Sequence, residues 1–350
     1  MPGAFEKIEV VVAGRGQAAD AESGVADALK VCRAVGVARD MVNEPGNVKS
    51  PEFFAGKARL LAEECGFDCR ILERDELEEE GMGAMLGVAQ GSVREPRLIV
   101  MEYRGAKKDA APVVLIGKGV VFDAGGISLK PSEGMEEMKM DMGGGAAVLG
   151  AMTAVATLGL PLNVVGLIPA VENLPSGSAI RPGDVLTSKS GKTIEVINTD
   201  AEGRLILADA LSYAERFAPA KVIDLATLTG ACIIALGHHA SAVLGSDAKL
   251  VEALRGAGDK TGERLWELPL WDDYDEQLNS GIADVKNIGG RAAGTITAAA
   301  FLKRFAGEYD WAHLDIAGTA WESSGRPYIP KGASGVGVRL LVEFLRGYGK

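Results

Sequence analysis

The chain has 350 residues, of which 47% are hydrophobic and 24% are charged, and its formal net charge is -11. This length allows one large α/β domain, or a large domain with a small one. The acidic balance, with no run of Lys and Arg anywhere, argues against a nucleic-acid partner, which requires a basic surface.

The N-terminus and the cysteines indicate a cytoplasmic protein. The first residues lack a basic stretch followed by a long apolar core, so no signal peptide is evident. No apolar run approaches transmembrane length. The chain has four cysteines without a zinc-finger pattern, and we expect reduced thiols because a chain of this size does not depend on disulfides. They are Cys32, Cys65, Cys69 and Cys232.

Hydrophobic periodicity predicts the first elements of the chain. Residues 8–12 are expected to form a short strand. Helices are expected at 23–41 and 51–65, and the segment NEPGN at 43–47 separates them because proline and glycine break a helix.

Farther along the chain, apolar strands alternate with helices. Strands are predicted at 69–72, 97–103, 113–117, 163–168, 193–198, 222–226 and 311–316. Helices are predicted at 144–158, 204–217, 247–258, 296–305 and 335–347. This alternation is typical of an α/β fold with a mixed, largely parallel central sheet and helices on both faces. Ligands of such sheets bind beyond the carboxyl ends of the strands.

Two segments, 117–145 and 197–205, follow predicted strands. They place acidic residues at the carboxyl ends of those strands, where ligands of such sheets bind. The acids are Asp123, Asp141, Asp200 and Glu202. Carboxylates crowded into one cleft repel each other, and divalent cations remove that repulsion. Two cations about 3.5–4 Å apart activate a shared water molecule. Lys130 and Arg204 are candidate positive charges beside a developing oxyanion.

Taken one at a time, these residues have ordinary structural explanations. A lone Asp in a loop is usually a helix cap or a turn residue, and acids in a first helical turn are favoured by the helix dipole. By residue type alone, Lys118 and Lys130 are surface lysines. The Gly-Lys-Gly at 117–119 has neither Walker nor GxGxxG spacing, so it does not indicate a nucleotide site.

The joint pattern is specific, and it resembles the leucyl (cytosol) aminopeptidase family of zinc/manganese peptidases. The similarity is carried by GKGVVFDAGGISLKP, MEEMKMDMGG, NTDAEGRL, DLATLTGAC, WELPLW, IADVKNIG, WAHLDIAGTAW and KGASGVGVRLL. It covers the chain from about Val25 to the C-terminus. The resemblance implies a hydrolase that releases N-terminal residues, preferably Leu, Met and other apolar ones, from peptides through a water activated by two metals.

The resemblance also implies a role for each site residue. The metal ligands for two zinc or manganese ions would be Lys118, Asp123, Asp141, Asp200 and Glu202. Lys130 would polarise the scissile carbonyl, and Arg204 would hold a bicarbonate that accepts a proton from the bridging water. The first side-chain pocket would be lined by Met138, Thr227 and Ala317, although Met138 is equally explained as a core residue.

The sequence departs from the family's pattern in three places. Members usually carry a further N-terminal domain, which is mostly absent here. We expect residues 1–23 to be its remnant or a leader segment and 24–350 to be the catalytic peptidase domain. Ala124 stands where the family commonly has Ser or Thr, and Gly145 stands where it usually has Ala. Ser334 replaces a usual Thr. None is a proposed ligand, so we expect the chemistry to be kept.

The sequence gives less support to other classes of function: a further two-metal hydrolase such as a phosphatase would normally use His and Asn ligands, which the proposed ligand positions do not offer. The three histidines lie outside the two acidic segments, which gives a His-based protease mechanism little support. We expect His313 to be a packed strand residue and His238 and His239 to be a surface or loop pair. The main alternative function is a catalytically weak homologue acting as a scaffold or binding protein. The resemblance also implies a homohexamer with active sites facing an inner cavity.

Overall fold

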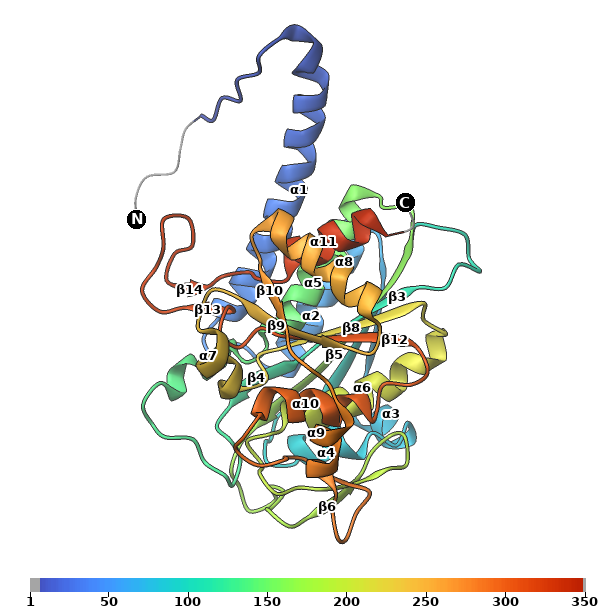
Figure 1. Cartoon of the computed structure of the whole chain (residues 1–350), viewed down its shortest axis with the longest axis vertical. Coiled ribbons are helices and arrows are strands. Elements are labelled where there is room, and N and C mark those ends of the chain that lie inside the picture. Colours follow the sequence, from blue (N-terminus) through green and yellow to red (C-terminus); the bar gives the residue numbers. More distant parts are fainter. Residues whose placement is uncertain (1–6, 349–350) are drawn as a thin grey trace.

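A nine-stranded sheet forms the centre of the computed structural model, which describes residues 7–348 (Figure 1). Its strands are β1 (Asp68–Leu72), β2 (Arg97–Arg104), β3 (Val113–Gly117), β4 (Gly119–Asp123), β5 (Asn163–Asn173), β8 (Lys221–Ala226), β9 (Ser241–Gly245), β10 (Leu265–Glu267) and β12 (Asp310–Asp315). Their order is β1-β2-β5-β3-β8-β12-β9-β10, and β4 pairs with β5 beyond the end of β3.

The middle of this sheet is parallel and its outer parts are mixed. β5, β3, β8 and β12 run parallel to one another, as do β4 with β5 and β9 with β10. The pairs β1–β2, β2–β5 and β12–β9 are antiparallel. The predicted mixed, largely parallel sheet is therefore confirmed.

Helices cover both faces of the sheet. One face carries α1 (Ala18–Asn43), α2 (Pro51–Cys65), α5 (Gly143–Leu158), α8 (Ala248–Thr261) and α11 (Val338–Gly347). The other carries α3 (Arg74–Glu79), α4 (Gly83–Ala89), α6 (Gly203–Ala214) and α10 (Gly294–Lys303). Successive strand residues point to opposite faces, so Val113 and Leu115 join the first core and Val114 and Ile116 join the second.

Shorter elements complete the fold. The helical ones are α7 (Gly230–Leu236), α9 (Asp272–Asp275), and the 3-10 turns η1 (Arg15–Gln17), η2 (Met135–Met140), η3 (Glu215–Phe217) and η4 (Glu276–Leu278). The strands β6 (Val185–Thr187), β7 (Thr193–Glu195) and β11 (Val285–Lys286) form a small separate sheet, and β13 (Trp321–Glu322) pairs with β14 (Gly332–Ala333).

Two predicted strands differ from the structure. The strand expected at 8–12 is wrong: these residues form no regular element, and Val11 is 90% exposed. Alternating apolar residues form a strand only beside a partner, and no strand among the described residues pairs with them. The strand expected at 193–198 is only β7, in the small sheet. α1 runs unbroken through the expected boundary between residues 23 and 24, so the domain division stays a prediction.

The start of α5 packs very closely against the strand ends. A Cβ added at Gly144 would lie 2.0 Å from Leu225 O, and one at Gly145 would lie 2.8 Å from Ile168 Cγ2. The span Met135–Leu158 is long and apolar enough to cross a membrane by composition, but 83% of its apolar window is buried in this structure. α5 is therefore a core helix whose first turn lies against the carboxyl ends of β3 and β8.

Candidate metal centre

The site begins where the sheet pairing is interrupted. β3 pairs with β5 as far as Ile116, and β4 resumes the pairing from Gly119. Lys118 lies between these strands, and its main chain instead donates to Leu225 O at 3.0 Å and accepts from Gly145 N at 2.8 Å. The interruption leaves Lys118 held between β8 and α5, with its side chain at the carboxyl end of the sheet.

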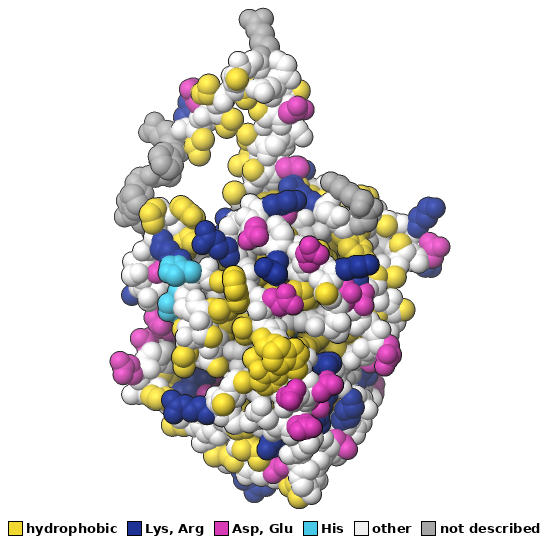
Figure 2. All heavy atoms as spheres, in the orientation of Figure 1, with side chains coloured by type: hydrophobic (Ala, Val, Ile, Leu, Met, Phe, Trp, Pro, Cys, Tyr) yellow, Lys and Arg dark blue, Asp and Glu magenta, His cyan; other side chains and the backbone are white. Residues whose placement is uncertain are grey.

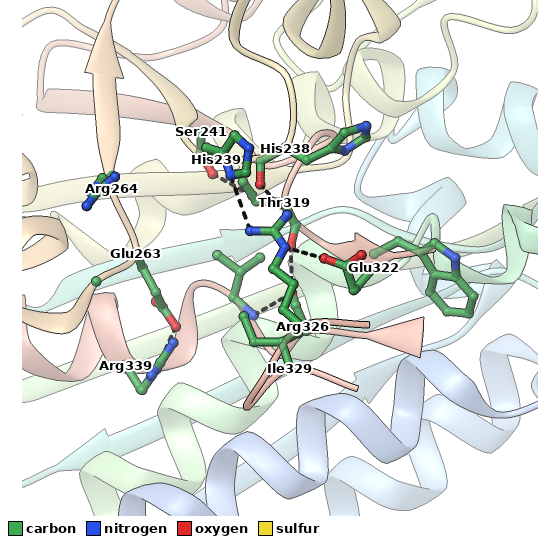
Figure 3. A pocket seen from close by; sticks show the side chains of 14 residues that line it. His238, His239, Ser241, Glu263, Arg264, Thr319, Glu322, Arg326, Ile329 and Arg339 are labelled. Atoms are coloured by element: carbon green, nitrogen blue, oxygen red, sulfur yellow. Dashed lines mark hydrogen bonds and ion pairs between the residues drawn. The ribbon is translucent and has the colours of Figure 1, made fainter. Parts of the chain in front are cut away.

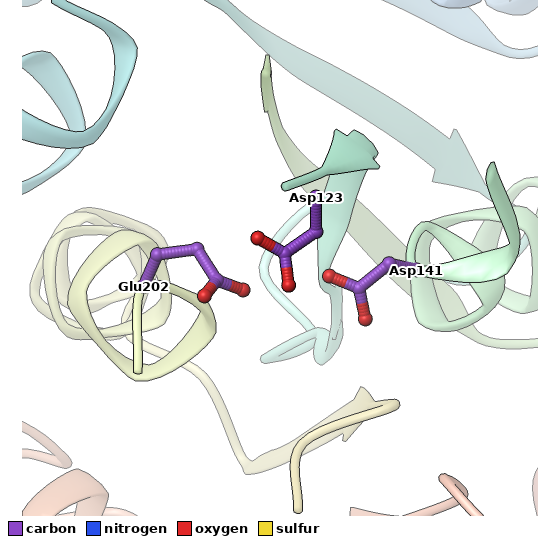
Figure 4. Close-up of side chains that lie close together, drawn as sticks. All are labelled: Asp123, Asp141 and Glu202. Carbon is purple, nitrogen blue, oxygen red and sulfur yellow. The ribbon is translucent and has the colours of Figure 1, made fainter. Parts of the chain in front are cut away.

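The four acids come from three different places in the fold. Asp123 is the last residue of β4, and Asp141 lies between η2 and α5. Asp200 and Glu202 lie in the turn that leads into α6. Asp123, Asp141 and Glu202 point toward one another in Figure 4, and each offers an oxygen within 4.8 Å of the others. Asp123, Asp141 and Glu202 are all buried, so this cluster is an interior feature of the fold.

The loop after β4 folds back onto the turn that carries Asp200. Gly125 and Gly126 both have left-handed backbone conformations, at φ 89° and 64°. Thr199 Oγ1 donates to Gly125 O at 2.7 Å and accepts from Ser128 N at 2.8 Å. These bonds join the two acidic segments, which lie far apart in the sequence.

Two lysines neutralise part of the acidic charge. Lys118 Nζ lies 2.7 Å from Asp141 Oδ2 and 2.8 Å from Glu202 Oε1. Lys130 Nζ lies 2.7 Å from Asp123 Oδ2 and 2.5 Å from Asp200 Oδ1. With every group ionised, four carboxylates and two ammonium groups give two excess negative charges in a largely buried volume.

Burial and mutual repulsion dominate the titration of these groups. Burial raises the pKa of Asp141, Glu202 and Asp200, and the carboxylate of Asp123 raises it further. Burial lowers the pKa of both lysines, but the surrounding carboxylates outweigh it, so each lysine pKa lies above its ordinary value. The cluster therefore favours added positive charge.

The donor set fits divalent cations. Carboxylate oxygens suit Mn and also bind Zn, and a lysine amine adds a nitrogen ligand once it is neutral. Asp141 Oδ2 and Asp200 Oδ1 are buried oxygens, and the lysine ammonium groups are their partners among the described residues. Each oxygen keeps a further lone pair, and buried carboxylate lone pairs are what a metal ion needs.

Arg204, in the first turn of α6, is buried beside the cluster. Its Nη1 donates to Asn287 O at 2.8 Å, and its Nε has no hydrogen-bond partner among the described residues. Burial lowers the pKa of Arg204 to about 10, so the guanidinium stays charged at neutral pH. One edge of a buried cation thus remains unused by the protein.

The three residues predicted to line a substrate pocket lie around the same cluster. Met138 belongs to η2, and its carbonyl accepts from Asp141 N at 3.2 Å. Thr227, just after β8, donates from Oγ1 to Asp141 Oδ1 at 2.8 Å, so its hydroxyl also orients a proposed ligand. Ala317 follows β12 and is half-buried. The pocket itself stays a prediction.

Two asparagines that the sequence analysis did not select support the site. Asn173, at the end of β5, donates from Nδ2 to Asp123 Oδ1 at 2.8 Å and to Thr199 O at 3.1 Å. The side chain of Asn287 bonds Ile197 N and Asn198 O, at 2.8 and 2.7 Å. Asn287 lies within the IADVKNIG segment, which was the only signal in the sequence that could have identified it.

The histidines lie as predicted. His313 is fully buried in β12, and its Nδ1 lies 2.6 Å from Asp224 Oδ1. His238 and His239 are exposed in the loop between α7 and β9, and histidine is visible at the surface in Figure 2. On that face Lys and Arg are interspersed with Asp and Glu, without a continuous basic surface.

A second hollow lies beside the two exposed histidines (Figure 3). Two of its arginines are already paired with acids: Arg326 with Glu322, and Arg339 with Glu263 at 2.9 Å. The charges in this hollow thus largely satisfy one another, in contrast to the carboxylate cluster.

Comparison with known proteins identifies the family. The model of the "Cytosol aminopeptidase family, catalytic domain" matches residues 36–342, which is most of the chain. The chain belongs to the cytosol aminopeptidase family. It carries the catalytic domain of a metal-dependent aminopeptidase, a hydrolase, as the motifs predicted.

Relatives in this family are similar over nearly the whole chain. A probable cytosol aminopeptidase of Syntrophotalea carbinolica is 62% identical over 345 residues, covering 99% of this chain and 69% of the relative. One of Geobacter sulfurreducens is 62% identical, covering 94% of this chain and 66% of the relative. The chain thus spans about two thirds of the length of these relatives.

A solved structure has the same fold. The bottromycin maturation enzyme BotP in complex with Mn superposes with a TM-score of 0.89 and 42% sequence identity. The match covers 94% of this chain and 73% of that one.

Proposed function

We propose that this protein uses two divalent cations to release N-terminal residues from peptides, with a preference for Leu, Met and other apolar residues. The observation that supports the proposal best is the convergence of Asp123, Asp141 and Glu202 around the Lys118 amine in one buried cluster. In a cytosol aminopeptidase such a cluster suits metal-assisted peptide hydrolysis.

The metals would be held by the chain's own acids. Lys118, Asp123, Asp141 and Glu202 would hold the more buried ion, and Asp123, Asp200 and Glu202 the exchangeable one. When bound, such ions lower the pKa of a water molecule and polarise a carbonyl. The Mn in the BotP structure supports manganese as a candidate, and zinc remains the other.

Lys130 is the residue we assign to the scissile carbonyl. Its side chain is 20% exposed, against 4% for Lys118, so it lies on the more open side of the cluster. Its ammonium contacts Asp123 and Asp200 and can donate a further hydrogen bond toward substrate. A fixed positive charge in that position stabilises negative charge that develops on the carbonyl oxygen.

Arg204 is the residue we assign to a bicarbonate ion. The free Nε edge of its guanidinium matches the geometry of a planar, carboxylate-like anion. The anion would supply the proton acceptor for the reaction. Arg204 itself would orient the anion and stay protonated.

Substrate selection would follow from the pocket and from the cluster's charge. Met138, Thr227 and Ala317 would present apolar surface to the first side chain, which suits Leu or Met. The acidic groups, with Asp200 the most exposed of them, would attract the free α-amino group of a peptide. A homohexameric assembly and a cytoplasmic location are part of the same proposal, supported by the family's name and the resemblance.

The test is hydrolysis of leucine p-nitroanilide after loading the protein with Mn or Zn, beside a Glu202→Ala control. We expect metal-dependent release by the parent and none by the control. A folded, metal-loaded parent that hydrolyses neither this substrate nor Leu-, Met- or Cys-led dipeptides would favour the scaffold alternative.

A further inference from the structure

A single buried carboxylate joins the two loops that carry the predicted pocket residues. Asp315 is the last residue of β12, and the side chain is inaccessible to solvent. It pairs in register with Ala226, the last residue of the neighbouring parallel strand β8. The loops that leave these two strands therefore start side by side, at the carboxyl end of the sheet.

Each oxygen of Asp315 is occupied. Oδ1 accepts from Leu228 N at 3.2 Å, in the loop after β8, and from Ala317 N at 3.1 Å, in the loop after β12. Oδ2 accepts from Thr229 Oγ1 at 2.6 Å. Two main-chain N–H groups and one hydroxyl thus bond this buried carboxylate, and His313 and Arg204 are the charged groups that act on it.

While Asp315 accepts its proton, the Thr229 hydroxyl uses its one donor position and both of its acceptor positions. It has one proton, which goes to Asp315, and two lone pairs, which accept from Cys232 N at 3.1 Å and from Thr295 Oγ1 at 2.8 Å. Thr229 also caps the start of α7. An amide nitrogen in place of Asp315 Oδ2 could be accepted only if the Thr229 hydroxyl turned its proton from Asp315 to Thr295 Oγ1, which would rearrange the hydrogen bonds of this loop.

The loop after β8, which Asp315 holds at Leu228, also contacts the metal cluster through the preceding residue, Thr227. Thr227 accepts from Lys118 Nζ through its main-chain oxygen at 3.1 Å, and it donates from Oγ1 to Asp141 Oδ1. A Cβ built at Gly143 would lie 3.6 Å from Thr227 Cγ2 and 3.9 Å from Ile316 Cδ1. Both loops thus meet at the first turn of α5, beside Asp141.

We infer that Asp315 is a positioning residue that sets the spacing of Thr227 and Ala317, and with it the discrimination between large and small N-terminal side chains. The inference rests on the proposed function for its choice of substrates. The hydrogen bonds of Asp315 go to Leu228, Ala317 and Thr229 and to none of the proposed metal ligands, so it acts through the two loops. Its loss is expected to widen or distort the pocket while the ligand set remains.

The experiment compares Asp315→Asn and Thr229→Val with the parent. The control is Asp310→Asn, an identical change at the other end of β12, where the carboxylate is half-exposed and pairs with Lys221. Two quantities are measured: kcat/KM for leucine against alanine p-nitroanilide, and calorimetric binding of free leucine against free alanine. Bound Mn is measured beside them.

We expect Asp315→Asn to lower the leucine-to-alanine ratio by about tenfold, mainly through KM for leucine, because a misplaced pocket loses contacts with each methylene. Thr229→Val is expected to lower it by about threefold, and Asp310→Asn to leave it unchanged. Equal losses on both substrates, or an unchanged ratio in both variants, would overturn the inference.

The two proposals fail in different ways. A parent that hydrolyses neither substrate contradicts the proposed function, and amino-acid binding then decides the inference alone. If the parent binds leucine more tightly than alanine and this preference weakens in the variants, the inference about Asp315 is supported. If the parent shows no such preference, the inference is overturned. If Asp315→Asn does not fold, Thr229→Val carries the test.

Discussion

Lys118 and Glu202 form a buried ion pair, with Nζ 2.8 Å from Oε1, although 83 residues separate them in the sequence. The same ammonium lies 2.7 Å from Asp141. In the metal-free protein Lys118 is thus the counter-ion that allows two carboxylates to remain buried. Proposed as a metal ligand, it would have to lose that charge when a cation binds nearby.

Replacing Lys118 with Met distinguishes a ligand from a mere counter-ion. Lys118→Met is expected to destabilise the metal-free protein by about 3–5 kcal/mol, because it leaves buried carboxylates without a cation. If Lys118 is a ligand, its loss should weaken Mn binding by at least about tenfold. That is the smallest loss of affinity expected when a residue that only orients a metal ligand is removed. Urea unfolding in EDTA and calorimetric Mn titration measure the two effects.

The control for this change is Lys189→Met, which removes an ion pair with Glu80 far from the cluster. That pair is about one-fifth exposed, so its loss is expected to cost about 1 kcal/mol. Tighter Mn binding by Lys118→Met would show that the ammonium competes with the metal rather than joining its ligands.

Lys130 is expected to act on the reaction and not on metal uptake. Lys130→Met should lower kcat by about 10²–10³-fold, as loss of one oxyanion donor does, with KM changed little. Steady-state kinetics on leucine p-nitroanilide and metal analysis of the same sample measure this. Lys139→Met is the nearby control, because Lys139 Nζ donates to Asn43 O instead. A variant that loses Mn together with activity would contradict the assignment.

Elements whose determinants are local were predictable. The helix expected at 51–65 is α2, because Ser50 caps it by accepting from Phe53 N and Gly66 ends it at φ 82°. The strand expected at 113–117 is β3, a fully buried apolar run. The acidic residues were also found, since they lie in short contiguous motifs.

Features that depend on pairing between distant segments were not predictable. β5 was expected to stop at 168, before Pro169, but it runs to Asn173. Pro169 is tolerated because it lies opposite the interruption at Lys118, between the pairings Ile116–Leu167 and Gly119–Ala170. Asn173 was therefore missed, because only the continued strand brings it to Asp123.

Asn173 is expected to tune metal affinity through its hydrogen bond to Asp123. Asn173→Ala should weaken Mn binding by about 10–100-fold, because a ligating carboxylate loses the partner that orients it. Calorimetric titration of the metal-free protein measures this. Asn163→Ala is the control: Asn163 is also nearly buried, but its side chain holds the loop at Lys107 and Ala110. Equal Mn affinities in both variants would contradict the prediction.

Asp209 is expected to make stability depend on pH. It is fully buried in α6, and its oxygens accept from Met85 N and Lys189 N, both at 2.8 Å. Burial, only partly offset by these donors, raises the pKa of Asp209 from 3.8 to about 7. Between about pH 4 and 7 the folded protein therefore holds a proton that the unfolded chain has released, and its stability falls as pH rises.

Asp209→Asn removes that titration. From pH 5 to pH 8 the stability of the variant relative to the parent should rise by about 2–3 kcal/mol, at about 1.4 kcal/mol per pKa unit. Urea unfolding of metal-free protein at the two pH values measures the difference. Asp184→Asn is the control without an effect: hydrogen bonds from Arg181 lower the pKa of Asp184 from its ordinary 3.8, so Asp184 is ionised in both states from pH 5 to pH 8 and the relative stability of this variant should not change. If the relative stability of Asp209→Asn does not change with pH, the backbone N–H donors outweigh burial, and Asp209 is ionised throughout this range.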